Sequence, residues 1–308
     1  MSILARRRPG SSLRRDVRQV ARGWRWGHRP LVPRSVEPPA IEPRDFPTAW
    51  ARTPAGTVAR AALQRFALQP LIRFETAPRI AGLDVLEGLE PPVIFVANHS
   101  SHLDAPLVLT SLPKRWRART ATGAAADYFF DRWVRATATA LVFNAFPVER
   151  SGSKGRTTAL ARDLLAEGWN LLVFPEGTRS RDGWVHDFRL GAARLACEEG
   201  VPVVPVALRG SYQAMPRGAA WVTKGRPPVR VRFGKPVRPE PGEAPAAFNE
   251  RVRAALAAGL DEEATTWWEA TRRAARGEAP QIGGPQGARW RRTWEASRPL
   301  ERGGKVFR

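Results

Sequence analysis

Residues Val93 to Pro106 read V-I-F-V-A-N-H-S-S-H-L-D-A-P and place a histidine five residues before an aspartate. The apolar run Val93–Ala97 is typical of a buried strand, and a helix-like pattern follows it. Such a polar turn between strand and helix is where α/β proteins place reactive groups. On one continuous helix His99 and Asp104 would point about 140° apart, so His99 must precede the helix for the two to meet. The carboxylate would then fix the imidazole tautomer, and the other ring nitrogen could accept a proton.

The same residues also allow a purely structural explanation. The stretch S-H-L-D forms an S-x-x-D capping arrangement, which would explain Ser101 and Asp104 as helix-start residues alone. Asn98 is likewise suited to a turn. His102 offers a second imidazole beside the first, and we expect it to be exposed rather than catalytic. The local sequence leaves both explanations open.

A second buried strand, Asn170–Phe174, ends in a comparable turn that reads P-E-G-T-R-S. The strand between the two turns ends at Arg150. Two arginines, Arg150 and Arg179, together with the Gly177-Thr178 backbone turn, form a suitable receptor for phosphate, since guanidinium binds phosphate oxygens in pairs. A neutral histidine next to such a receptor suggests an acceptor that carries both a hydroxyl and a phosphate.

Composition narrows the possible function classes. At 308 residues with 43% hydrophobic side chains, the chain can bury a sizeable core. Its 50 Lys and Arg against 29 Asp and Glu favour anionic partners such as lipid headgroups, phosphorylated substrates or nucleic acid. A basic nucleic-acid-binding protein is the alternative of a different class, but no recognition-helix, OB-fold or zinc pattern supports specific nucleic-acid binding. The single cysteine, Cys197, excludes an intrachain disulfide and a cysteine metal site, and we expect no metal.

The two ends of the chain differ from its middle. Residues 1–45 are rich in Arg and Pro and predict a disordered basic arm, and residues 263–308 form a Trp- and Arg-rich tail. No secretory signal is evident, and no run approaches the ~18 apolar residues of a membrane-spanning helix. We therefore expect a cytoplasmic protein that contacts the inner face of the membrane peripherally, with Arg and Trp at an anionic lipid surface.

Strands and helices alternate over residues 80–262, which predicts an α/β domain with a mixed, mostly parallel central sheet flanked by helices. Ahead of it, residues 46–79 contain helical stretches interrupted by Pro54 and Pro70, and we expect an N-terminal helical hairpin. This hairpin could pack on the core or lie on a membrane.

Two further segments carry specific structural expectations. Asp127–Phe143 predicts one helix whose wide apolar face is either buried on several sides or lines a long apolar pocket. Val203–Leu208 contains Pro205, which predicts a short strand or a strand at the edge of the sheet.

Four motifs in this order resemble the motif blocks of the glycerolipid acyltransferases, whose best-known members are the bacterial 1-acylglycerol-3-phosphate (lysophosphatidate) acyltransferases. They are N-H-x-S-x-x-D at 98–104, F-P-x-x-R at 146–150, F-P-E-G-T-R-S at 174–180 and V-P-V-V-P-V at 201–206. Each block alone is weak, but four in family order are specific. The resemblance covers residues 75–240.

The resemblance implies an O-acyltransferase in which His99 is the general base and Asp104 orients its imidazole. The acceptor hydroxyl would attack the thioester of acyl-CoA or acyl carrier protein directly, without an acyl-enzyme and without any cofactor beyond this co-substrate. The matching block residues would bind the lysophospholipid acceptor, most simply 1-acylglycerol-3-phosphate. They are Asn98, Ser101, Arg150, Glu176, Gly177, Thr178 and Arg179.

The sequence also departs from the pattern of the lysophosphatidate enzymes. The region before the second block, T-G-A-A-A-D-Y-F-F, contains no lysine, and Asn144 lies near the glycine that is usual in that block. These departures concern the acceptor rather than acyl transfer. Another lysophospholipid or a different alcohol is therefore an alternative acceptor for the same fold.

Overall fold

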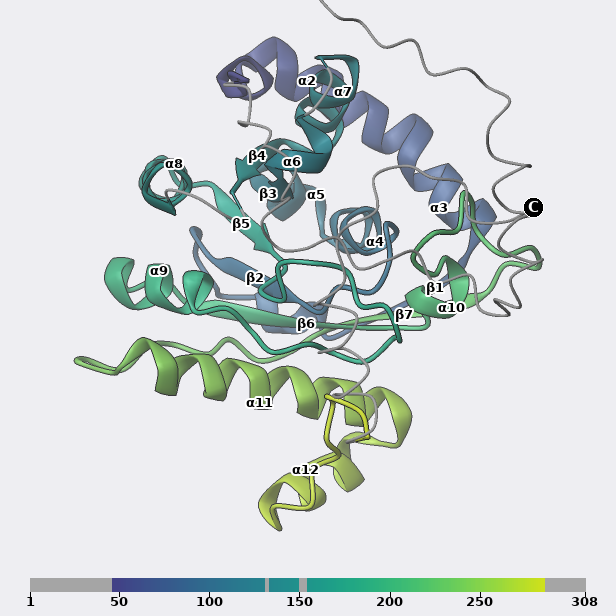
Figure 1. Cartoon of the computed structure of the whole chain (residues 1–308), viewed down its shortest axis with the longest axis vertical. Helices are drawn as coiled ribbons and strands as arrows, with labels where there is room; N and C mark the ends of the chain where they lie inside the picture. The colour runs from purple at the N-terminus through teal and green to yellow at the C-terminus, as the bar shows by residue number, and fades with distance from the viewer. Residues whose placement is uncertain (1–45, 131–132, 150–153, 286–308) are drawn as a thin grey trace, which may run out of the picture. The chain divides into compact units, whose positions relative to one another are not determined.

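The computed structural model describes residues 46–130, 133–149 and 154–285, which are built around a seven-stranded sheet (Figure 1). The strands are β1 (Ala77–Ala81), β2 (Ile94–Ala97), β3 (Thr120–Ala125), β4 (Ala145–Val148), β5 (Asn170–Val173), β6 (Val203–Arg209) and β7 (Pro228–Phe233). They lie in the order β1-β7-β6-β2-β5-β3-β4, and neighbours are parallel except β6 and β7. The prediction of a mixed, mostly parallel sheet is confirmed.

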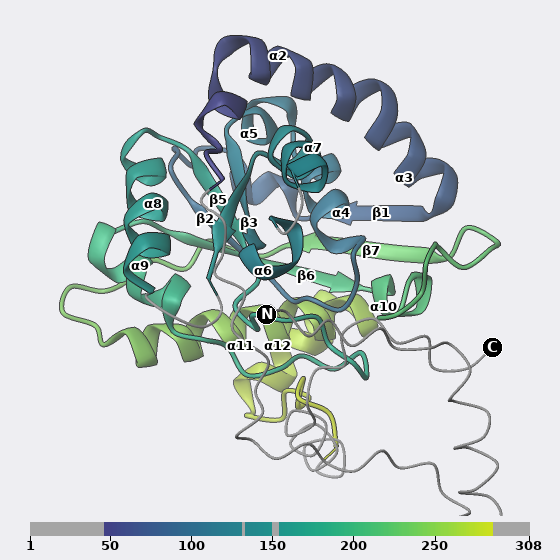
Figure 2. The same ribbon diagram turned by 45° about the horizontal axis from the view of Figure 1, so that its top comes forward.

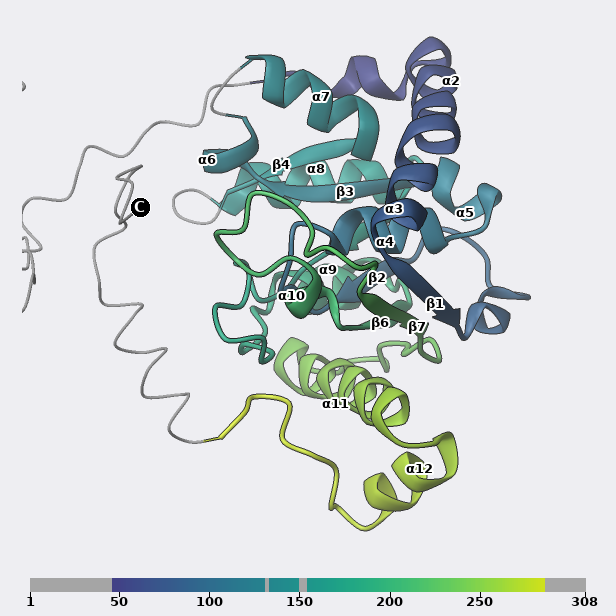
Figure 3. The ribbon, with the colours of Figure 1, turned by 90° about the vertical axis from the view of Figure 1, so that its right-hand side faces the viewer.

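Helices cover both faces of this sheet. They are η2 (Ala49–Arg52), α2 (Pro54–Leu63), η3 (Gln64–Leu68), α3 (Gln69–Glu75), η4 (Leu83–Leu86), α4 (Asp104–Ser111), α5 (Lys114–Ala118), α6 (Ala126–Phe129), α7 (Trp133–Phe143), α8 (Lys154–Ala166), α9 (Gly191–Glu199), α10 (Ser211–Ala214), α11 (Pro245–Ala264) and α12 (Trp267–Ala275). In Figure 3, α11 lies on one side of β6 and β7, and α3, α4 and α7 lie on the other. Among the described residues no helix is long and apolar enough to cross a membrane.

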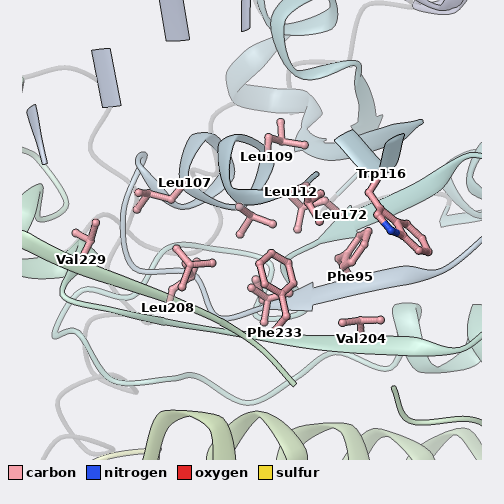
Figure 4. Close-up of a cluster of buried hydrophobic side chains, with 14 of the residues drawn as sticks. Phe95, Leu107, Leu109, Leu112, Trp116, Leu172, Val204, Leu208, Val229 and Phe233 are labelled. Carbon is pink, nitrogen blue, oxygen red and sulfur yellow. The ribbon is translucent and has the colours of Figure 1, made fainter. Parts of the chain in front are cut away.

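Strand β2 is fully buried and divides its side chains between two cores. Phe95 belongs to the core beneath α4 and α5, where its ring meets the edges of Trp116 and Phe233 at centroid distances of 6.0 and 6.2 Å (Figure 4). Ile94 and Val96 belong to the opposite core, built with α8, α9 and α11. Since successive strand residues point to opposite faces, a continuous apolar run is what a strand covered on both faces requires.

The N-terminal helical segment is one continuous run rather than the expected hairpin (Figure 2). Pro54 takes the first position of α2, where its missing N–H costs nothing, and Thr53 caps that helix by accepting from Gly56 N at 3.2 Å. Pro70 follows the π-helical turn η3, in which Gln69 N donates to the carbonyl five residues earlier. This wider turn accommodates a proline that would otherwise break the helix.

The expected single helix over residues 127–143 is also wrong, because α6 ends at Phe129. Phe130 has non-helical dihedrals (φ −110°, ψ 19°) and its side chain is buried against Ala136 and Ala145. Helix α7 then begins at Trp133. The non-helical backbone of Phe130 therefore ends the first helix.

Strand β6 is neither short nor at an edge, contrary to the expectation from Pro205. It has seven residues and lies between β7 and β2. The Pro205 carbonyl accepts from Gly234 N at 2.8 Å, just past the end of β7. The N–H and C=O groups of one strand residue point to the same side of the strand. The N–H group that Pro205 lacks would therefore also point toward β7, at a level where β7 has already ended.

Candidate active site

The turn after β2 brings His99 and Asp104 together. His99 follows the strand and Asp104 is the first residue of α4, and His99 Nδ1 lies 2.9 Å from Asp104 Oδ2. The same oxygen accepts the backbone N–H groups of Ser100 (2.6 Å) and Ser101 (2.7 Å). The Asp104 side chain is fully buried, whereas that of His99 is 21% exposed. A buried carboxylate thus holds an imidazole that remains accessible.

The two explanations of this turn hold at the same time. By accepting from Ser101 N, Asp104 forms one half of a capping box. The other half is missing, because Ser101 Oγ accepts from Leu103 N at 3.2 Å and donates to Met215 O at 2.8 Å. One carboxylate oxygen therefore orders the turn and contacts the imidazole.

Asn98 is buried and bonds to one backbone position of β6. Its Nδ2 donates to Leu208 O at 2.9 Å, and its Oδ1 accepts from Leu208 N at 2.8 Å. The side-chain amide thus continues the β2–β6 ladder by one pair beyond Ala97 and Val206. This contact sets the direction in which the chain leaves the strand just before His99.

Glu176, in the turn after β5, fixes the backbone around His99. Its Oε1 accepts from His99 N at 2.6 Å and its Oε2 from His186 N at 2.8 Å. Ser180 N donates to His99 O at 2.7 Å, and the Phe174 ring stacks on the imidazole at a centroid distance of 4.2 Å. Because β2 and β5 are adjacent and parallel, their two turns meet at the same edge of the sheet.

The remainder of this second turn supplies a cationic surface. Gly177 has φ +71°, and a Cβ there would lie 2.6 Å from Arg189 Nε, so only glycine allows this guanidinium its position. Thr178 and Arg179 follow, both half-buried. Arg217 approaches from the segment after α10, and its Nη1 donates to Arg179 O at 3.3 Å.

Arg217 was not anticipated from the sequence, because no motif contains it. Its segment is anchored by α10, where Ser211 Oγ lies 3.0 Å from Ser100 Oγ and Tyr212 OH donates to Arg181 O at 2.8 Å. The segment therefore contacts both turns. Arg150, the other predicted phosphate ligand, lies outside the described residues.

His102 is partly buried, which corrects the expectation of an exposed imidazole. Its ring stacks on Tyr128 at a centroid distance of 5.6 Å, and Tyr128 Oη lies 3.4 Å from its Nε2. Burial first, and the positive charge of Arg179 second, lower the pKa of His102 to about 4. His102 is therefore neutral near pH 7 and cannot contribute to phosphate binding as a cation.

The chain is similar to several known proteins. Residues 74–209 match the family described as Acyltransferase. The chain is 34% identical over 160 residues to a chloroplastic 1-acyl-sn-glycerol-3-phosphate acyltransferase of Brassica napus (51% of this chain, 44% of that protein). It is 32% identical over 184 residues to the Arabidopsis thaliana chloroplastic enzyme of that name (59% and 49%). The chain thus spans about half the length of the curated relatives it matches.

A solved structure is similar over more of its length. The crystal structure of the 1-acyl-sn-glycerophosphate (LPA) acyltransferase PlsC from Thermotoga maritima matches with a TM-score of 0.51 and 26% identity. The match covers 66% of this chain and 82% of that one. The Acyltransferase match over residues 74–209 and these relatives together show that this part of the chain is similar to the glycerolipid acyltransferases.

Proposed function

We propose that this protein is an O-acyltransferase that moves a fatty acyl group from acyl-CoA or acyl carrier protein to the hydroxyl of a lysophospholipid, most simply 1-acylglycerol-3-phosphate. The observation that carries the proposal is the contact of 2.9 Å between His99 Nδ1 and the buried Asp104 Oδ2, with Arg179 in the adjoining turn. The names of the relatives supply the acceptor.

In the proposed reaction, Asp104 accepts the Nδ1–H of His99 and leaves Nε2 as the proton acceptor. Nε2 takes the hydroxyl proton as the acceptor oxygen attacks the thioester carbonyl. The tetrahedral intermediate then expels the thiolate, which takes the proton back from the imidazolium. Asp104 stabilises that imidazolium because its negative charge is 2.9 Å away and buried.

Direct transfer, without an acyl-enzyme, is supported by the hydroxyls beside the histidine. Ser100 Oγ lies 3.0 Å from Ser211 Oγ, and Ser101 Oγ donates to the Met215 carbonyl. A serine nucleophile would need its hydroxyl on the imidazole nitrogen instead. We therefore assign these serines to the scaffold and the nucleophile to the substrate.

We assign the acceptor phosphate to Arg179 and Arg217. Arg217 Nη1 donates to the Arg179 carbonyl, and both charges act on the pKa of His102, one turn from His99. Guanidinium groups bind phosphate oxygens in pairs, so two from different segments can hold the headgroup from two sides. Glu176 keeps the turn in place through its two backbone N–H bonds rather than by contact with an anion.

We further propose that the protein acts at the surface of an anionic membrane, from the cytoplasmic side. Phe66 and Phe74, on η3 and α3, are 79% and 74% exposed, and Trp133 and Val134 begin α7 with exposed side chains. Exposed apolar side chains on a chain with a formal net charge of +21 suit the boundary between anionic lipid headgroups and acyl chains.

The test is acyl transfer by the purified protein, measured as thiol release and by mass spectrometry of the lipid product. Acyl-CoA and acyl carrier protein are each offered with a panel of lysophospholipids and simple alcohols. We expect 1-acylglycerol-3-phosphate to give the highest kcat/KM. Preference for an unphosphorylated alcohol would contradict the phosphate assignment, and DNA binding without acyl transfer would contradict the function.

A further inference from the structure

The loop 181–186 follows the second turn and depends on contacts with two other parts of the chain. It contains neither helix nor strand, so its backbone N–H groups need partners elsewhere. Val185 N donates to Ile282 O at 3.1 Å, and the next N–H, that of His186, donates to Glu176 Oε2 at 2.8 Å. Two consecutive backbone groups thus bind the segment after α12 and the glutamate of the histidine site.

The segment after α12, residues 281–285, packs closely on this loop, and we call it the C-terminal strap. In Figure 3 the yellow chain leaves α12 and runs toward the end of the sheet that carries α6 and α10. Ile282 is partly buried against the core that contains Val185. Gly284 is buried with φ +74°, and a Cβ there would lie 2.6 Å from the Trp184 ring, so only glycine permits this approach.

A continuous series of contacts leads from the strap to the histidine. Glu176 binds the His186 N–H through Oε2 and the His99 N–H through Oε1, the latter at 2.6 Å. The two oxygens of a carboxylate are a fixed distance apart, so a shift of the His186 backbone either moves Oε1 or weakens one of the two bonds. The position of the strap is therefore transmitted to the His99 backbone through one side chain.

A small displacement of His99 is enough to affect the rate. Its Nδ1 lies 2.9 Å from Asp104 Oδ2, a contact that weakens as its distance and angle depart from ideal values. A misplacement of about 1 Å costs up to about 10²-fold in rate, even when the altered residue is far from the reacting atoms. The start of the loop, next to Arg179, has its own support, because Tyr212 Oη donates to Arg181 O at 2.8 Å.

We propose that the C-terminal strap positions His99 for catalysis by holding the loop 181–186 against Glu176; the inference rests on the proposed acyltransferase function. Ile282 and Gly284 are then positioning residues that act through the loop. Loosening the strap lowers kcat, whereas the KM of the acceptor is retained because the phosphate site keeps its support from Tyr212.

The test uses full-length variants with matched controls. Ile282→Asp places a charge against the core and releases the strap, whereas Ile282→Val keeps the apolar contact. Gly284→Ala adds a methyl group against Trp184. Gly277→Ala is its control for backbone strain, because Gly277 has φ +70° and nothing among the described residues lies within 4 Å of an added Cβ. Gly283→Ala is its control for position, since an added Cβ there meets the end of one arginine at 4.0 Å.

Hydrogen exchange followed by mass spectrometry measures the protection of individual backbone amides. Steady-state thiol release gives kcat and the KM of each substrate, and thermal unfolding on the same samples shows that the variants are folded. We expect Ile282→Asp and Gly284→Ala to accelerate exchange of the Val185, His186 and His99 amides about tenfold or more. Their kcat should fall about 10- to 100-fold, with each KM within about threefold of wild type.

Ile282→Val and both glycine controls should match wild type in exchange and in kcat. If Ile282→Asp does not fold, Gly284→Ala decides the matter. Faster exchange at Val185 alone, with His99 still protected and kcat unchanged, would overturn the inference and leave the strap a purely structural role. A loss of kcat without faster exchange at His99 would overturn it as well.

The two proposals fail in different ways. If exchange at His99 responds to the strap as expected while wild type transfers no acyl group, the proposed function fails and the coupling between strap and histidine stands. If wild type transfers acyl groups and every strap variant retains both kcat and the protection of His99, the inference fails and the function stands.

Discussion

Asp104→Asn tests the histidine turn most directly, because asparagine keeps the shape of the side chain and loses its charge. Asp104 Oδ2 accepts from His99 Nδ1, Ser100 N and Ser101 N, while Oδ1 is buried without a partner. The asparagine carbonyl can take the place of Oδ2 and its amide that of Oδ1. All three donors then keep an acceptor, so we expect the free energy of unfolding to fall by no more than about 1–2 kcal/mol.

The activity of Asp104→Asn should fall far more than its stability. Loss of one charged hydrogen bond to the imidazolium, about 1.5–3 kcal/mol, lowers kcat roughly 10- to 150-fold. If the amide group turns toward His99 instead, Nε2 carries the proton and the general base is lost, which raises the reduction to as much as ~10⁴-fold. We expect a value between these limits, with the KM of both substrates little changed.

The assay is steady-state thiol release, with thermal unfolding measured on the same samples. Asp261→Asn is the matched control, since Asp261 is another buried carboxylate and pairs with Arg273 away from the histidine. That variant should lose stability but keep kcat. A folded Asp104→Asn protein that retains kcat within about threefold of wild type would refute an orienting role for Asp104 and leave it only its role in the turn.

Three further outcomes are expected. Arg179→Ala and Arg217→Ala should each raise the KM for a phosphorylated acceptor about 10- to 100-fold, and an equal loss with an unphosphorylated acceptor would exclude the phosphate contact. The pKa of His102 is lowered to about 4, so between about pH 4 and 6.5 the folded protein binds fewer protons than the unfolded chain. The free energy of unfolding should therefore fall by up to about 3 kcal/mol as the pH falls through this window. In urea titrations, His102→Gln should no longer show this dependence of stability on pH. Phe66→Glu and Phe74→Glu should weaken cosedimentation with anionic vesicles but leave turnover on detergent-dispersed substrate unchanged. Binding of the wild-type protein to these vesicles should decrease as the salt concentration rises. Equal sedimentation with neutral vesicles would contradict an electrostatic contribution to membrane binding.

The strands that carry the two turns were predictable because their sequences leave little choice. Val93–Ala97 and Asn170–Phe174 are apolar at nearly every position, which only a strand buried on both faces explains, and each ends at polar turn residues. Helix geometry gave only the condition under which His99 and Asp104 can meet, namely that His99 precedes the helix, and the structure meets this condition. Local chemistry was sufficient wherever strand and turn adjoin in the sequence.

The remaining features depend on contacts between distant segments. Pro205 suggests an edge strand, yet whether its missing N–H matters depends on where the neighbouring β7 ends. Pro70 suggests a break, yet the π-helical turn before it accommodates the ring. Arg217 has no local pattern at all, because its place near Arg179 comes from α10 and the end of β6.

The order of the strands explains how motif blocks that are far apart in the chain come to lie at one edge of the sheet. The motif blocks end β2, β4 and β5 and form β6, and in the sheet these strands span the sequence β6-β2-β5-β3-β4. Four strand spacings make this edge about 19 Å long, with His99 one strand from one end. Arg179 follows β5, and Arg217 follows β6 and α10, so the two arginines of the proposed acceptor site come from strands on either side of β2. We propose that an acceptor phosphate held by both arginines places the acceptor hydroxyl beside His99, because His99 follows the strand that lies between theirs.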